Sequence, residues 1–181
     1  MRSLGTRFDA DLAWVRPNMW CRRLELRAGD ETVATLDWPR RFRSIALATT
    51  ADGEWTFERA GFWPAHVSVR FAGAETEDAR FEASRTGTGI LHLEGGSTVA
   101  WKAGNFWRTR WGWHDAAGSL LIGFRRRTVG LQVEGAVEVE VDAPTPARLA
   151  LLVCLGWYLV VLSGNPGGGV SAGPAKSSAN A

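Results

Sequence analysis

The chain has 181 residues, of which 45% are hydrophobic, so it can form one folded domain with a substantial core. Its 21 basic and 19 acidic residues give a net charge of +2, and no nucleic-acid partner is expected at so small a charge. The two cysteines lack metal-ligand spacing and the N-terminus lacks an apolar leader, so a cytoplasmic location is expected.

The first two thirds of the chain predict short strands and hairpins. Residues 1–19 form an N-terminal arm or short strand, with loose alternation from Phe8 to Trp14. Residues 20–38 predict a hairpin that turns at Ala28–Glu31. A second hairpin joins residues 44–50 to residues 54–59 across Ala51-Asp52-Gly53.

The same pattern returns along the sequence as an internal repeat. Residues 57–70 align without a gap with residues 101–114, so that Phe57 matches Trp101 at an offset of 44 residues. Earlier and later strand and turn segments correspond in the same way. Three units of about 44 residues with about four strands each predict roughly twelve antiparallel strands, in a barrel or sandwich.

One helix is predicted after the strands, at about residues 146–163. Thr145 precedes it as N-cap, Pro146 takes its first position, and Gly164 follows as a left-handed cap. The run Leu149–Leu162 is apolar on every side, so it must be buried in protein or in lipid. Gly156 at mid-helix would allow a large side chain to approach closely. Residues 164–181 are rich in Gly, Ser and Ala and predict a disordered tail.

The length of the run favours protein over lipid. Its 14 residues span about 21 Å as a helix, whereas the hydrocarbon core of a bilayer is about 30 Å thick. A barrel of about twelve strands has room for a helix inside it. The predicted fold is therefore mainly β: a closed antiparallel barrel over residues 20–163, built from three hairpin-pair repeats, that encloses the C-terminal helix.

This arrangement resembles the tubby C-terminal superfold, shared by tubby-like proteins, phospholipid scramblases and plant LURP-one-related proteins. The segments that carry the resemblance are residues 57–70, Asn105–Trp113 and Ala150–Val161, and it would cover about residues 20–163. It implies a non-enzymatic barrel that binds a lipid headgroup or a protein partner. The basic pattern of tubby proteins and the acidic calcium segment of scramblases are not found, so no functional residue is carried over.

Catalytic and metal-binding motifs are not found in the sequence. No His-x-His, HExxH or Cys-x-x-Cys spacing occurs, and His66, His92 and His114 are interpreted as strand-face residues. No nucleophile elbow or phosphate loop is present either. We therefore expect neither enzymatic activity, nor a cofactor, nor a bound metal.

Two arginine clusters are the candidate binding residues for an anionic ligand. Each follows a predicted strand, and together they comprise Arg40, Arg41, Arg43, Arg125, Arg126 and Arg127. They could form a solvated turn or strand end, as most charge runs do, or two basic loops that contact anionic headgroups near one end of the barrel. Membrane contact would be at most peripheral. The aromatic and basic segment Asn105–His114 is interpreted as a barrel wall with tryptophans towards the core.

Two alternative functions remain open. The first is a carbohydrate- or protein-binding β-trefoil, since three repeats of about four strands also describe that fold. The second is a tail-anchored membrane protein whose span is Ala147–Ser163. The location of the helix distinguishes both alternatives from the barrel with a central helix.

Overall fold

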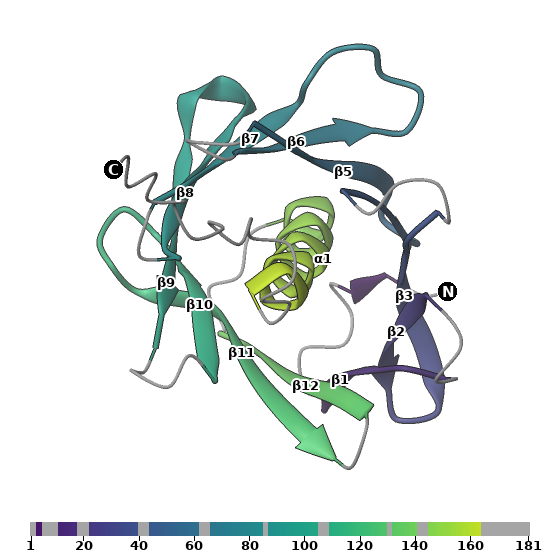
Figure 1. The fold of residues 1–181 in the computed structure, drawn as a ribbon. Coiled ribbons are helices and arrows are strands. Elements are labelled where there is room, and N and C mark those ends of the chain that lie inside the picture. Colours follow the sequence, from purple (N-terminus) through teal and green to yellow (C-terminus); the bar gives the residue numbers. More distant parts are fainter. Residues whose placement is uncertain are drawn as a thin grey trace, which may run out of the picture.

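The computed structural model of the protein is a closed antiparallel β-barrel of twelve strands around a single α-helix, α1 (Pro146–Ser163) (Figure 1). The structure describes residues 3–4, 11–17, 22–39, 44–61, 66–84, 87–104, 109–129, 132–140 and 145–163. This confirms the predicted fold class. The predicted tail, residues 164–181, lies outside the described residues.

The strands form a meander in which each pairs with the next along the chain. The short strand β1 lies between β12 and β2 and closes the barrel. Because the barrel is a simple meander, its fold is not a β-trefoil. The remaining strands are β2 (Arg23–Ala28), β3 (Glu31–Asp37), β4 (Ile45–Thr50), β5 (Glu54–Ala60), β6 (His66–Phe71), β7 (Ala79–Ala83), β8 (Gly89–Leu93), β9 (Thr98–Ala103), β10 (Arg110–His114), β11 (Leu120–Val129) and β12 (Gln132–Val139), with β1 at Leu12–Val15.

The first predicted hairpins match the structure. The hairpin predicted at residues 20–38 is β2–β3, and Gly29 takes the left-handed conformation (φ 61°) that its tight turn requires. The second predicted hairpin is β4–β5. The two aligned segments of sequence run through β5–β6 and β9–β10, which are both hairpins. The threefold repeat itself stays a prediction.

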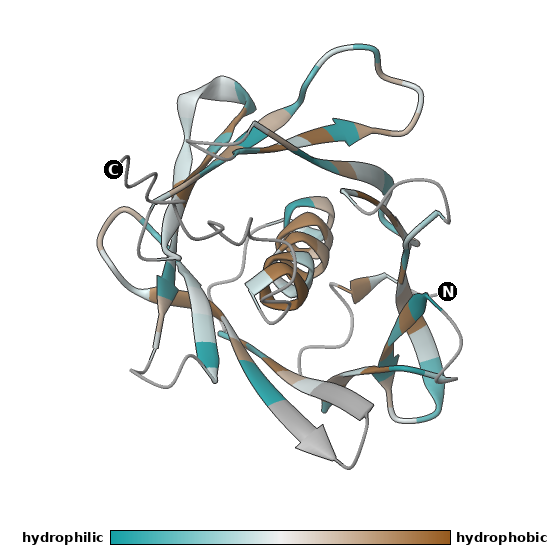
Figure 2. Ribbon diagram, viewed as in Figure 1, coloured by the Kyte–Doolittle hydropathy of each residue, from teal (hydrophilic) through white to brown (hydrophobic). Residues whose placement is uncertain are grey.

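Alternation of side chains separates the lumen of the barrel from its outer surface. In β5, Trp55 and Phe57 are buried against the lumen, whereas Glu54 is exposed on the other side. The same period brings Trp111 and Trp113 of β10 into the core, as predicted for the aromatic segment. Figure 2 shows apolar residues along the helix and alternating hydropathy along the wall. The core therefore lies between the helix and the inner faces of the strands.

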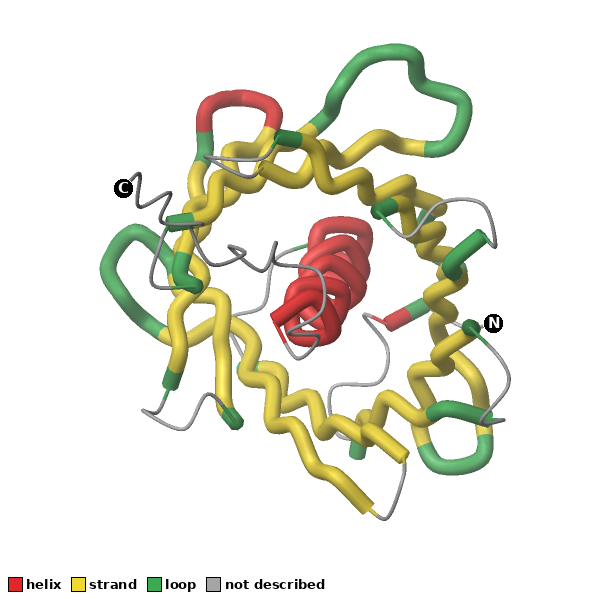
Figure 3. The backbone as a smooth tube through the Cα atoms, in the orientation of Figure 1, coloured by secondary structure: helices red, strands yellow, loops and turns green. Residues whose placement is uncertain are grey.

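The helix begins at Pro146, as predicted, and fills the lumen. The backbone N–H of Leu149 donates to the carbonyl of Thr145 at 2.8 Å, which closes the first turn. Twelve residues, from Leu149 to Val160, are buried. By length and composition the helix could cross a membrane, but in this structure the barrel surrounds it (Figure 3). Burial on every side explains why its sequence has no polar face.

Two glycines allow the helix and the wall to approach closely. A Cβ at Gly156 of α1 would lie 2.3 Å from the Phe124 ring, which confirms the predicted close approach. A Cβ at Gly135 of β12 would lie 1.8 Å from the indole of Trp157. That indole also stacks on Trp14 of β1, with the ring planes 3° apart. The register of the helix in the lumen is therefore fixed by large side chains that pack onto glycine backbone.

Candidate functional site

The barrel has two mouths, and the direction of α1 distinguishes them. At one mouth α1 begins, and Arg148 Nη2 donates to Ser97 Oγ at 3.2 Å, beside the β8–β9 connection. At the other mouth α1 ends, with Leu162 and Ser163 close to Arg59 at the end of β5. Because neighbouring strands are antiparallel, successive connections alternate between the two mouths.

The mouth where α1 begins is acidic. Its connections between consecutive strands are residues 29–30, 51–53, 72–78, 94–97 and 115–119, all of them described. They contain no arginine or lysine and seven carboxylates: Asp30, Asp52, Glu75, Glu77, Asp78, Glu94 and Asp115. We call these seven residues the acidic mouth.

The mouth where α1 ends has the opposite composition. The segments of sequence that join strands there are residues 16–22, 38–44, 61–65, 84–88, 104–109 and 130–131. They contain no acidic residue and seven arginines, of which Arg16 and Arg22 are described, whereas Arg40, Arg41, Arg43, Arg85 and Arg108 lie outside the described residues. The strand ends that reach this mouth carry Arg23, Arg59, Arg110, Arg125 and Arg126, together with the carboxylates Asp37, which pairs with Arg23 at 3.4 Å, and Glu82. We call the described arginines of these two sets the basic mouth.

Although the net charge is only +2, negative charges are concentrated at one mouth of the barrel and positive charges at the other. The separation is favourable to the helix, because a helix carries about half an elementary charge at each end, negative at its C-terminus. The basic mouth surrounds that negative end. Half a charge is far smaller than the charge of seven described arginines, so stabilisation of the helix accounts for only a small part of this arrangement.

Alternation places Arg59 and Arg126 on the lumen-facing side of their strands, and Arg16 and Arg22 lie one residue outside β1 and β2. Arg59 follows Trp55 and Phe57 in the inward series of β5, and Arg126 follows Ile122 and Phe124 in β11. By the same register Arg16 follows Trp14, and Arg22 precedes Leu24. Within the described part of the chain, none of these four side chains has a carboxylate partner.

The predicted arginine clusters are only partly brought together. Arg40, Arg41 and Arg43 fall outside the described residues. Arg125, Arg126 and Arg127 lie within β11, so they are strand residues, as one of the predicted alternatives has it, and do not form a basic loop. Consecutive strand residues face opposite sides, so Arg126 faces the lumen side and Arg125 lies on the outer surface, directly across from Arg110 of β10. The side chain of Arg127 is outside the described part.

Arg59 and Arg16 were missed by sequence reasoning because each stands alone, and Arg22 was missed because the pair Arg22-Arg23 falls in the predicted hairpin at residues 20–38. A signal for Arg59 was nevertheless present. Trp55, Phe57 and Arg59 alternate with polar residues, so the pattern puts the guanidinium on the inner face at the end of a strand. The pattern does not predict the direction of each strand relative to the helix, so it does not show at which mouth Arg59 lies.

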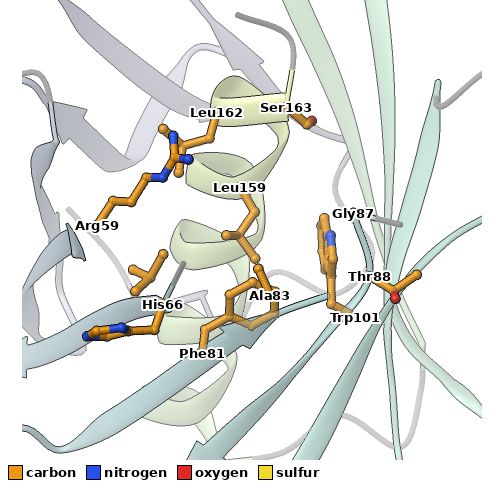
Figure 4. Close-up of a pocket in the computed structure, with 11 residues that line it drawn as sticks. Arg59, His66, Phe81, Ala83, Gly87, Thr88, Trp101, Leu159, Leu162 and Ser163 are labelled. Carbon is orange, nitrogen blue, oxygen red and sulfur yellow. The ribbon is translucent and has the colours of Figure 1, made fainter. Parts of the chain in front are cut away.

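A cavity of about 210 Å³ lies at the basic mouth, between the last turns of α1 and the strands β5, β6, β7 and β9 (Figure 4). Apolar side chains of Phe81, Trp101, Leu159 and Leu162 form most of its wall. Arg59 and His66 lie at one edge of it, on the opposite side from Trp101. The cavity therefore combines an apolar interior with a cationic rim.

The remaining titratable groups do not form a reactive cluster in the described part of the chain. No group of three His, Cys, Asp or Glu side chains is placed there to hold a metal ion. Burial raises the pKa of the Cys154 thiol, which keeps it protonated and unreactive in the core. Burial also raises the pKa of Tyr158, whose hydroxyl donates to the carbonyl of Ser44 at 2.8 Å. Both groups are thus structural.

No family model, no curated protein and no solved structure matches the chain.

Proposed function

We propose that this domain is a non-enzymatic binding module that attaches peripherally to anionic phospholipid surfaces through its basic mouth. The observation that carries the proposal is the composition of the strand connections at the two mouths: seven carboxylates and no basic residue in those at one, and arginines without an acidic residue in those at the other. An anionic surface attracts one end of such a barrel and repels the other. Attachment would therefore have a single orientation, with the acidic mouth away from the lipid.

The state of the arginines supports the proposal further. Arg16, Arg22 and Arg126 have no ion-pair partner among the described residues, so binding a phosphate would not require an existing salt bridge to break. By contrast, Arg27 and Arg80 on the outer surface are already paired with Glu25 and Glu77, at 3.0 and 2.9 Å. The resemblance to the tubby superfold implies a closed barrel around a helix, and membership of that superfold remains a proposal.

Co-sedimentation with vesicles tests the proposal. The full chain is expected to pellet with vesicles of phosphatidylcholine and phosphatidylserine at low salt. It should stay in solution with phosphatidylcholine alone or at high salt, because exposed charges are then screened. Failure to pellet with the anionic vesicles at low salt would refute the proposal.

Matched variants locate the binding surface. Arg16→Gln/Arg22→Gln removes two charges from the basic mouth, and partition onto anionic vesicles should fall about 30-fold, at about 1 kcal/mol per arginine. Arg27→Gln/Arg80→Gln changes the net charge equally on the outer surface and should have little effect. Equal losses in both double variants would show that net charge, and not the basic mouth, determines binding.

A further inference from the structure

The cavity at the basic mouth has the chemistry of a small-molecule site. Its interior is built from Phe81 and Trp101 on the wall and from Leu159 and Leu162 on the helix. Figure 4 shows these side chains on two sides of one space, with Leu159 between the helix and the wall. Ligand sites are typically apolar hollows with a few polar groups that fix orientation. Here the polar group is the guanidinium of Arg59, because His66 alternates with the inward-facing Val67 and directs its imidazole to the outer surface.

Arg59 is half-buried and has no carboxylate partner among the described residues. The adjacent carboxylate, Glu58, is on the opposite face of β5, where it accepts from Arg70 at 2.9 Å. Glu58 is therefore not available to neutralise Arg59. A cation without a partner beside an apolar wall favours an anionic group on any occupant.

The C-terminal end of α1 also faces the cavity and opposes this preference. Its partial negative charge is about half an elementary charge, less than the full charge of Arg59. Ser163 Oγ also donates to the carbonyl of Val160 at 2.8 Å, so one of the last carbonyls is already satisfied. The balance of charge at the rim is therefore positive.

We propose that this cavity binds a small anionic amphiphile, a single short alkyl chain with a terminal carboxylate. The carboxylate would accept hydrogen bonds from Arg59, and the chain would lie between Leu159 and the rings of Phe81 and Trp101. The volume of about 210 Å³ corresponds to roughly seven water-sized groups at about 30 Å³ each. Seven groups correspond to the six methylenes and the methyl group of octanoate, whose carboxylate would lie at the rim beside Arg59.

Calorimetric titration of the full chain with hexanoate, octanoate, decanoate and dodecanoate tests the predicted size. From hexanoate to octanoate, each methylene should tighten binding about fourfold, equivalent to about 0.8 kcal/mol. Beyond octanoate or decanoate the gain should stop, because further carbons extend into solvent. Absence of binding, or affinity that rises steadily to dodecanoate, would overturn the proposal.

The charge of the ligand is tested with octan-1-ol, which has the same chain without the carboxylate. The wild-type protein should bind octanoate at least about tenfold more tightly than octanol, because a charge-assisted hydrogen bond is lost with the alcohol. In Arg59→Gln this preference should disappear, while octanol binding is unchanged. Equal affinity for the two ligands in the wild-type protein would contradict the role of Arg59.

The place of binding is tested by filling the cavity. Ala83, which lines it, is half-buried at the end of β7, and Ala83→Phe should abolish octanoate binding. Ala72→Phe makes the same change at an exposed position near the acidic mouth and should leave binding intact. Thermal melting of both variants is the control for folding, and each should unfold cooperatively. Octanoate binding that survives Ala83→Phe would place the ligand elsewhere.

The site does not depend on membrane attachment, and these titrations contain no vesicles, so each proposal can fail without the other.

Discussion

The indole Nε1 of Trp113 donates a hydrogen bond of 2.8 Å to the main-chain carbonyl of Leu152, in the middle of the buried helix. Both residues are fully buried, and 39 positions of sequence separate them. The indole reaches the helix backbone because Gly156, one turn further on, has no side chain: a Cβ there would lie 2.9 Å from the same nitrogen. The wall is thus attached to the helix by a specific polar contact as well as by apolar packing.

Trp113→Phe should therefore destabilise the protein by about 2–3 kcal/mol, from a lost hydrogen bond of about 1 kcal/mol and a cavity beside the helix. Trp55→Phe is a suitable control, because Trp55 is buried in the wall but packs edge-on against Phe71. Trp55→Phe should lower the free energy of unfolding by about 1 kcal/mol less than Trp113→Phe does, because no hydrogen bond to the helix is lost. Urea unfolding measures both free energies, and equal losses would mean that the bond to Leu152 contributes nothing.

Gly156→Ala should destabilise the protein by about 1–3 kcal/mol, although alanine is the better helix former by about 1 kcal/mol. The added methyl group would lie 2.3 Å from Phe124 Cζ. In Gly123→Ala, on the same strand as Phe124, the nearest atoms would lie 3.7 Å away, so this control should be close to neutral.

A double variant identifies the cause of the Gly156→Ala loss. Phe124→Leu shortens the side chain that the new methyl group meets, so the two substitutions together should cost about 1 kcal/mol less than the sum of the single losses. Strict additivity of the unfolding free energies would show that Phe124 is not the residue in conflict.

The sequence predicted the elements of this fold better than its candidate site. Periodicity and caps located the helix at 146–163 and the first two hairpins, because these signals are local. The arginines at 125–127 were interpreted as one cluster, but a strand directs Arg125 and Arg126 to opposite faces. The acidic and basic mouths could not be recognised from composition, because the assignment of each connection to a mouth depends on the order of all twelve strands.

A chain ending at Glu140 lacks α1 and should not fold. The helix contributes twelve buried residues, and each large apolar side chain is worth about 1.5–3 kcal/mol when buried. For the nine large side chains the sum is about 14–27 kcal/mol, which equals or exceeds the roughly 5–15 kcal/mol that stabilises a typical domain. Near-ultraviolet circular dichroism should show no fixed tryptophan environment in this chain.

A chain ending at Ser163 is the control for this truncation, because it keeps every buried residue of the helix. It should melt like the full chain. A cooperative thermal transition in the chain ending at Glu140 would contradict the central role of α1 and would favour a barrel that fills itself with wall side chains.

Stability should decrease at alkaline pH because of Cys154 and Tyr158. Burial raises the pKa of both groups, and for Tyr158 the positive charge of Arg59 offsets part of this rise. In the unfolded chain they ionise near their ordinary pKa values of 9.0 and 10.0. Unfolding thus releases protons above about pH 9, so stability is fully present below that pH and falls as pH rises, by up to about 1.4 kcal/mol per pH unit for each group.

The double variant Cys154→Ala/Tyr158→Phe tests this origin of the alkaline loss. It should be less stable than the wild-type protein at about pH 8, because the hydrogen bond from Tyr158 to Ser44 is worth about 1 kcal/mol. Its urea midpoint should nevertheless change less between about pH 8 and pH 10.5. Tyr158 is the one tyrosine of the chain and only two lysines are present, so few other groups titrate in this range. The same slope in both proteins would assign the alkaline loss to groups outside the core.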